Sequence, residues 1–246
     1  MIASLPMYDR HELQAANDRL WHAVRENLGF GPDSLKRDGD IWEHWMSPDL
    51  LLSQTCGFPY RARLHGAVQL VGTPDNRLEG CAPGEYCSVF VARADELRDQ
   101  IKDYSSSVFA YNEPLSQSGW AAAANYGFSR GFSFARTSKS GGHLFSAKAV
   151  AEGRADLAAI DALTWRHIQR YDDFAAQLRV VAHTDPTPTL PFITARDRDL
   201  APIRDALAKA IADLREDDRE SLSLYGLVDI PAERYLSVRT PVPPSS

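Results

Sequence analysis

Long apolar runs, a leader segment and a cysteine framework are all missing from this sequence. None of its 246 residues belongs to an apolar stretch of the roughly 18 residues that a membrane helix requires, which argues against membrane insertion. The segment from Met1 to Tyr8 lacks a basic region followed by an apolar core, so we expect no secretory signal. The 3 cysteines are too few for a disulfide scaffold, and none stands in a C-x-x-C pair.

Clustered positive charge is missing as well. The chain carries 27 basic and 33 acidic residues, a net charge of −6, and its Lys and Arg residues are scattered, which argues against a nucleic-acid partner. A single small anion needs only a local site, so anion binding stays open. No phosphate-binding G-x-x-x-x-G-K-[ST] or zinc-binding H-E-x-x-H motif is present, and the 7 histidines show no metal-ligand spacing. We therefore expect no enzyme, cofactor or metal.

Helical and strand-like periods alternate along the chain. Helices are expected at 12–28, 94–101, from the turn at 116–119 through about 125, from 143 to Gly153, and at 162–170 and 199–214. Strands are expected at 2–5, 50–53, 68–72, 87–91, 107–111, 157–160 and 178–182. This alternation predicts an α/β protein with mixed, mostly parallel sheets and helices on both faces. The Pro/Ser-rich end, 241–246, is expected to be loose.

Four turns of the chain carry small polar residues in place of bulky ones. Open α/β sheets bind ligands at the carboxyl ends of their strands, where such turns expose backbone N–H groups. The four turns are Ser53-Gln54-Thr55-Cys56-Gly57, Asn112 with Ser116-Gln117-Ser118-Gly119, Thr137-Ser138-Lys139-Ser140-Gly141-Gly142-His143, and Asp161. These turns are the candidate binding elements.

The turn Ser116-Gln117-Ser118-Gly119 has the composition of an anion site. The first N–H groups of a helix have no partner within it and carry partial positive charge, and small residues allow an anion to reach them. The alternative is an ordinary N-cap by Ser116 or Ser118, since serine is favoured there for helix stability alone.

The other candidates have similar alternatives. His143 can donate to an oxyanion, or it can be a structural histidine. Asp161 can accept from a protonated ligand oxygen, or it can cap the helix that follows. Cys56 could act as a nucleophile with His143 and Asp161, although nothing in their spacing supports such a triad. Aromatic residues that could line a pocket, or belong to the core, are Tyr8, Trp45, Tyr60 and Trp120.

These segments together resemble a known family. Met7-Tyr8-Asp9, the run from Leu51 to Tyr60, Asn112-x-x-x-Ser116-x-Ser118-Gly119 and Gly142-His143 followed by 149–156 occur here in one order. They are similar to the PhnD-like phosphate, phosphite and phosphonate-binding proteins of ABC transporters. The likeness covers about residues 3–195, and its most specific part is 143–161.

The resemblance implies a two-lobed type II periplasmic-binding-protein fold with two crossover hinge strands. Lobe one would be 1–91 plus 192–246 and lobe two 92–191, with hinges near 89–93 and 190–194. The ligand, a small anionic solute, would lie between the lobes. Further implied are a monomer, a permease partner and a periplasmic location, although the missing export signal keeps a cytoplasmic location open.

The resemblance also implies which residues bind the ligand. These are Ser116, Gln117, Ser118, Gly119, His143 and Asp161 in lobe two, faced by Tyr8, Thr55 and Cys56 in lobe one. The Ser-Gln-Ser turn departs from the Ser-Thr-Ser pattern of phosphonate binders, so the ligand could differ. Cys56 and Cys81 would be the better disulfide pair. Three functions stay open: an oxyanion receptor, a cytoplasmic enzyme or sensor domain on the same fold, and a receptor for a heterocyclic vitamin precursor.

Overall fold

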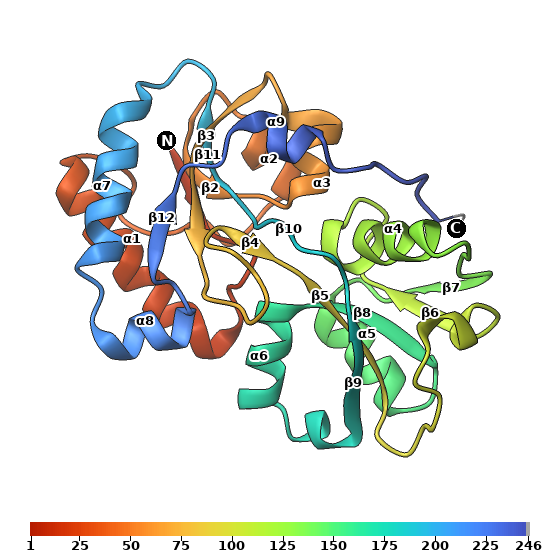
Figure 1. Ribbon diagram of the computed structural model, residues 1–246. Coiled ribbons are helices and arrows are strands. Elements are labelled where there is room, and N and C mark those ends of the chain that lie inside the picture. Colours follow the sequence, from red (N-terminus) through yellow and green to blue (C-terminus); the bar gives the residue numbers. More distant parts are fainter. Residues whose placement is uncertain (245–246) are drawn as a thin grey trace. The chain divides into compact units, whose positions relative to one another are not determined.

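The computed structural model describes residues 1–244, which divide into two compact units (Figure 1). Unit 1 consists of Met1–Glu85 and Pro188–Ser237, and unit 2 consists of Tyr86–Thr187 together with the C-terminal residues from Val238 onward. The first two boundaries fall in a two-stranded sheet of β4 (Glu85–Tyr86) and β10 (Thr187–Pro188). The expected lobe boundaries, after residues 91 and 191, differ from this division by several residues, and 88–93 is a strand inside unit 2. Residues 238–244, expected in lobe one, group with unit 2.

Unit 1 is built on a five-stranded sheet in the order β1-β2-β11-β3-β12. Its strands are β1 (Ile2–Ser4), β2 (Leu50–Gln54), β3 (Val68–Asp75), β11 (Phe192–Ala195) and β12 (Gly226–Val228). β1 and β2 pair in parallel, whereas β11 is antiparallel to both β2 and β3. β1, β2 and β3 therefore run in one direction and end at the same edge of the sheet.

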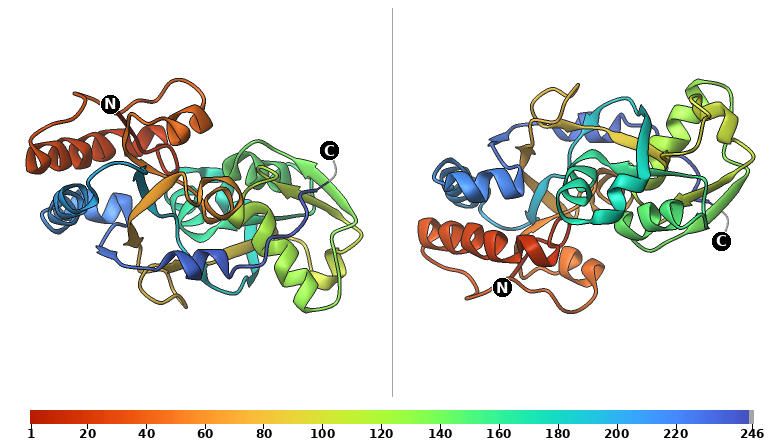
Figure 2. Two further views of the ribbon diagram at one scale, coloured as in Figure 1. Left: turned by 90° about the horizontal axis from the view of Figure 1, so that it is seen from above. Right: turned by 90° about the horizontal axis from the view of Figure 1, so that it is seen from below.

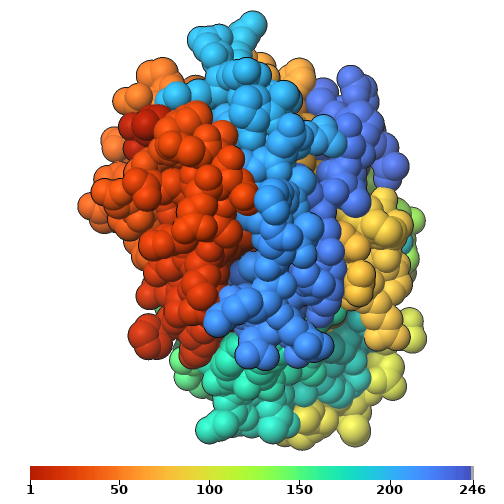
Figure 3. Space-filling model, turned by 90° about the vertical axis from the view of Figure 1, so that its left-hand side faces the viewer, coloured from red at the N-terminus to blue at the C-terminus, as the bar shows by residue number. Residues whose placement is uncertain are grey.

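Two long helices of unit 1 pack against each other. α1 (Gln14–Leu28) buries Leu20, Trp21 and Val24, and α7 (Leu200–Ala212) buries residues at the same helical spacing. α1 ends at Gly29, whose φ of 81° suits glycine because it has no Cβ. The two helices lie side by side (Figure 2) and form adjoining red and blue bands on the surface of unit 1 (Figure 3).

Short helices complete unit 1. They are η1 (His11–Leu13), α2 (Ile41–Met46), α3 (Gly57–Pro59), the π-turn η2 (Tyr60–Leu64), α8 (Glu216–Leu222) and α9 (Ala232–Leu236). Asp40 caps α2 by accepting from the backbone N–H groups of Trp42 and Glu43. Trp45 of α2, Tyr60 of η2 and Tyr235 of α9 are buried in one cluster with side chains of β2, β3 and β11. Trp45 and Tyr60 are thus core residues.

Unit 2 is built on a second five-stranded sheet, in the order β7-β6-β8-β5-β9. Its strands are β5 (Ser88–Arg93), β6 (Val108–Tyr111), β7 (Arg136–Lys139), β8 (Leu157–Asp161) and β9 (Leu178–His183). β6 pairs in parallel with β7 and β8, and β5 is antiparallel to β8 and β9. Four of these strands therefore share one direction and β5 runs against them, so both sheets are mixed.

Alternation along the strands of unit 2 separates two apolar faces. Val89, Val91 and Ile160 face a cluster with α5 (His143–Ala151) and α6 (Ala162–Tyr171). On the opposite face of the sheet, Phe90 of β5 contacts Tyr126 and Phe109 of β6 contacts Trp120, so an aromatic group forms there. This second face is covered by η4 (Gln117–Ala121) and α4 (Ala122–Ser129), with η3 (Ile101–Tyr104) and η5 (Asp173–Gln177) in the connections. Helices on both faces were expected.

Two expectations about local structure are wrong. The segment expected as a helix at 94–101 does not form one. Its Leu97 is 88% exposed, and the Arg98 guanidinium donates to the Glu96 carboxylate. The C-terminal segment is not loose throughout, because Pro241 is buried and the Val242 carbonyl accepts from Trp120 Nε1. Residues 245 and 246 of that expectation lie outside the described part of the chain.

The buried carboxylate of Asp218 joins α8 to α1 and provides a test of the fold. Asp218 is 4% exposed and accepts from Arg19 Nε at 2.9 Å and Arg215 Nε at 3.1 Å. Asp218→Ala should lower the free energy of unfolding by about 1–3 kcal/mol, because it leaves both guanidinium groups without their partner but free to rehydrate. Urea denaturation measures the change. Asp213→Ala, which removes an exposed pair with Lys209, is the control and should cost about 0.5 kcal/mol or less. Equal effects of the two changes would contradict this role of Asp218.

Candidate functional site

The carboxyl edge of the unit 2 sheet gathers most of the predicted binding residues. β6 ends before Asn112, and β8 ends at Asp161, which pairs with Ser88 at the start of β5. α5 begins at His143, just after β7 and its turn. Because β6, β7 and β8 run in parallel, these polar residues meet at one edge, as the sequence predicted.

Ser116 begins the helical segment at this edge. Its hydroxyl accepts from the Gly119 N–H at 3.0 Å, and its carbonyl accepts from the Ala121 N–H at 3.0 Å. The latter bond spans five residues, so the first turn, η4, is a π-turn, a form that is frequent at functional sites. The N–H groups of Ser118 and Trp120 precede the first helical hydrogen bond. Ser116 is therefore an N-cap, and the same turn offers N–H groups to a ligand.

Ser118 and His143 are in direct contact. Ser118 Oγ lies 2.8 Å from His143 Nε2, and the Ser88 hydroxyl donates to the Ser118 carbonyl at 2.9 Å. Ser118 is 3% exposed. The contact therefore joins the start of η4 to the start of α5, two helix N-termini that both carry partial positive charge.

His143 is neutral in this setting. Burial lowers its pKa to about 4, because an imidazolium loses hydration there, although the neighbouring Ala159 carbonyl opposes the decrease. Nδ1 has no hydrogen-bond partner among the described residues. The neutral ring carries one proton, so in the 2.8 Å contact either Nε2–H donates to Ser118 Oγ or the Ser118 hydroxyl donates to Nε2. In both cases the pair carries no net charge.

Asp161 and the residues around it are tied into the backbone. Asp161 is 2% exposed, and its Oδ1 accepts from the Thr164 N–H at 2.9 Å, so it caps α6. The Ser140 hydroxyl forms hydrogen bonds with the Tyr111 and Gly142 carbonyls and with the Ser146 hydroxyl. These bonds stabilise the turn before His143. The capping alternative for Asp161 is thus realised.

Gly119 permits the close approach of Asn112. A Cβ added at Gly119 would lie 1.9 Å from Asn112 Oδ1, so no side chain fits there. Asn112 Oδ1 is itself buried and has no hydrogen-bond partner among residues 1–244. Sequence reasoning had named Asn112 only as part of the turn.

The three predicted residues of unit 1 lie near the carboxyl edge of its own sheet. Tyr8 lines a cavity of about 30 Å³, the size of one water, together with Asn17, Gln54 and Asn76. Thr55 and Cys56 follow β2 directly. Thr55 is fully buried, and its Oγ1 has no hydrogen-bond partner in the described chain. Of the amide side chains that line this cavity, Gln54 belongs to a predicted turn, whereas Asn17 and Asn76 were not named from the sequence.

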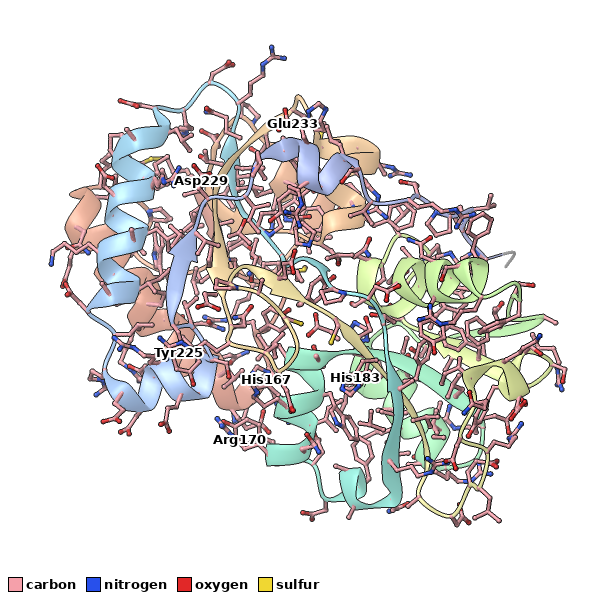
Figure 4. All side chains as sticks on the ribbon, in the orientation of Figure 1. His167, Arg170, His183, Tyr225, Asp229 and Glu233 are labelled. Atoms are coloured by element: carbon pink, nitrogen blue, oxygen red, sulfur yellow. The ribbon has the colours of Figure 1, made fainter. Side chains whose placement is uncertain are left out.

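The described residues show neither the implied disulfide nor a metal site. Cys56, Cys81 and Cys87 are free thiols, so the implied Cys56–Cys81 disulfide is wrong. In the part that the structure describes, no cluster of His, Cys, Asp or Glu could hold a metal, and no helix is long and apolar enough to span a membrane. His167 lies on α6 and His183 at the end of β9 (Figure 4).

The residues Gly127–Gly131 match the G-x-S-x-G pattern of a hydrolase nucleophile. That pattern is functional on a strand-to-helix turn, whereas here it spans the end of α4. The Ser129 hydroxyl donates to the Tyr126 carbonyl at 3.0 Å. Ser129 is therefore not in a nucleophile position.

Comparison with known proteins identifies the family. Residues 49–232 match the family described as ABC transporter, phosphonate, periplasmic substrate-binding protein. The chain belongs to this family. A search of curated protein sequences gave no match. The family consists of periplasmic substrate-binding proteins of transporters, not of enzymes.

Solved structures agree with this fold. PhnD1 from Prochlorococcus marinus in complex with methylphosphonate has a TM-score of 0.75 at 15% identity, covering 95% of this chain and 94% of that chain. XAC2383 from Xanthomonas citri bound to ATP has a TM-score of 0.71 at 15% identity, covering 97% and 94%. A binding protein component of an ABC phosphonate transporter from Pseudomonas aeruginosa has a TM-score of 0.67 at 16% identity, covering 92% and 80%. The protein has the two-lobed type II periplasmic-binding-protein fold.

The contact between Gly119 and Asn112 can be tested by a rescue experiment. Gly119→Ala should destabilise the protein by about 1–3 kcal/mol, because the new methyl group overlaps the Asn112 amide. Asn112→Ala in the same chain should recover most of that loss, since it removes the two atoms nearest to the methyl and leaves the Asn112 backbone N, at 3.3 Å, as the next one. Urea denaturation measures both. Gly226→Ala, whose added carbon meets only Asp75 Cβ at 3.7 Å, is the matched control. A double variant as unstable as Gly119→Ala would refute the assignment of this clash.

The low pKa of His143 predicts a pH dependence of stability. The unfolded chain takes up a proton near pH 6.5, whereas the folded protein takes it up only near pH 4. The contribution of His143 is therefore fully present above pH 6.5 and is lost as the pH falls towards 4, by about 3 kcal/mol at most. His143→Gln should remove this part of the slope, and replacement of the exposed His183 by Gln should leave it in place. If NMR shows the His143 ring titrating near pH 6.5, the burial argument is wrong.

Proposed function

We propose that the protein binds a small phosphorus oxyanion, such as a phosphonate, phosphite or phosphate, at the Ser116–Gly119 loop. The observation that carries the proposal is the Ser118–His143 contact at two adjoining helix N-termini. Backbone N–H groups, the Ser118 hydroxyl and the partial charges of both helices provide donors for one set of oxygens. Membership of the phosphonate-binding family supports the same ligand class.

The donors are sufficient in number for binding without any chemical step. Hydrogen bonds to a charged group contribute roughly 1.5–3 kcal/mol each, so four or five of them reach about −8 kcal/mol, which corresponds to a micromolar dissociation constant. We propose that the protein is not catalytic. The enzyme alternative relied on a reactive Cys56 or His143, whereas the family consists of substrate-binding proteins of transporters, which supports binding without catalysis.

The remaining assignments stay predictions. Tyr8, Thr55 and Cys56 are predicted to contact the same ligand, and Thr55 is the most informative of them because its hydroxyl has no partner in the described chain. A permease of an ABC transporter is the predicted protein partner, on the basis of the family. A monomer in the periplasm is predicted for the same reason.

Calorimetry with methylphosphonate, phosphite, phosphate and sulfate tests the proposal. Ser118→Ala and His143→Ala should each weaken binding at pH 7 by roughly fivefold or more, because each removes a member of the donor pair. The free energy of unfolding without ligand should change little. Ser129→Ala, at the other end of α4, should leave the affinity unchanged.

Two outcomes would count against it. An equal loss of stability and affinity in both variants would mean that the pair is structural. A heterocyclic compound that binds where every oxyanion fails would favour the vitamin-precursor alternative.

A further inference from the structure

The C-terminal segment of the chain lies on the helix that carries the proposed binding loop. After α9 in unit 1, residues 238–244 are part of unit 2. The Trp120 indole N–H donates to the Val242 carbonyl at 2.9 Å. Trp120 follows Gly119 directly, so this bond reaches the turn that begins at Ser116.

A second set of contacts holds the start of the segment. Asn125 Nδ2 donates to the Arg239 carbonyl at 2.9 Å, and an Arg239 guanidinium nitrogen donates to Asn125 Oδ1 at 2.9 Å. The same guanidinium lies 3.8 Å from the centre of the Phe128 ring. Arg239 is thus held by both a two-way hydrogen bond and a cation–π contact.

The geometry of an extended chain explains how both sets form together. Val242 is three positions after Arg239, a span of about 10 Å when extended. On the helix, Asn125 is five positions after Trp120, a rise of about 7.5 Å. The segment therefore runs along the helix towards its N-terminus. Pro241, Pro243 and Pro244 favour such an extended form with little loss of entropy, and Pro241 is buried.

Trp120 connects this segment to the binding turn. Its side chain is 9% exposed, and its ring lies against Tyr111 and Phe109 of β6, with centroids 5.7 and 6.4 Å away. One face of the residue is therefore fixed by the sheet, and its N–H is fixed by the C-terminal segment. The backbone N–H of Trp120 belongs to the turn that we propose binds the ligand.

We propose that residues 238–244 act as a positioning segment for the Ser116–Gly119 loop. By holding Trp120 and Asn125, the segment keeps the donor groups of η4 in their binding arrangement before a ligand arrives. The inference rests on the proposed function for its effect on affinity, but its effect on the order of the loop stands independently of any ligand.

The test combines hydrogen exchange with ligand dissociation, on the full-length protein. Asn125→Ala, Arg239→Ala and Trp120→Phe each release one contact of the segment. Each should raise the exchange rate of the backbone amides at 118–120 roughly fivefold and the dissociation rate of methylphosphonate by a similar factor. The hydrogen bond between the Arg239 guanidinium and Asn125 Oδ1 is lost in both variants, so the double variant should show less than the sum of the two single changes. Arg130→Ala is the matched control. The Arg130 guanidinium also lies over an aromatic ring of α4, 3.6 Å from the centre of the Tyr126 ring, but Arg130 caps α4 and is not part of the segment 238–244.

Two outcomes would overturn the proposal. Faster exchange confined to 238–244, with the loop unchanged, would overturn it. Faster exchange that extends equally to β6 and β8 would show general stabilisation of unit 2 and would also overturn it. If the unchanged protein binds none of the oxyanions, the proposed function fails, and the exchange rates at 118–120 still decide whether the segment positions the loop.

Discussion

The candidate site depends on the contact between Ser118 Oγ and His143 Nε2. It joins two helices through residues that are 25 positions apart in sequence, and it does so with a histidine that burial keeps neutral. A charged histidine would attract anions of many kinds, and a carboxylate partner would repel them. For the ligand class proposed above, a neutral Ser–His pair at two helix ends would select by geometry, because the ligand oxygens must lie where the hydrogen-bond donors of the turn point. The electrostatics of this edge thus come from oriented dipoles more than from net charge.

The scaffold explains why the pair can form. In unit 2, four strands run in one direction, and β5 runs against them between β8 and β9. That arrangement places the ends of β6, β7 and β8 together with the start of β5, where Ser88 binds the Ser118 carbonyl. Gly119 then allows η4 to approach Asn112 at the end of β6. Residues from four separate segments therefore support one short turn, which suits a site that must be ordered before its ligand arrives.

Sequence patterns were most informative where burial is continuous. The apolar run at 157–160 predicted β8, and the spacing of Leu20 and Val24 predicted α1, because both elements bury a defined face. β7, Arg136–Lys139, was missed because an exposed edge strand shows no apolar alternation. The helix expected at 94–101 did not form, and Leu97, on the apolar side that this helix would have had, is 88% exposed. The candidate turns were recognisable as strand ends, whereas the Ser118–His143 contact and the position of residues 238–244 depend on tertiary packing that no local pattern encodes.

The strand order of unit 1 has a consequence for biosynthesis. β11 lies between β2 and β3, yet it leaves the ribosome only after both of them and after all of the continuous part of unit 2. Until then, β2 and β3 lack the neighbour that pairs with both of their inner edges, and unpaired strand edges are prone to association with other chains. Unit 2, by contrast, has all of its strands in one stretch. The first segment of the nascent protein therefore exposes these strand edges until β11 has been synthesised, which makes late translation the stage at which the sheet of unit 1 can close.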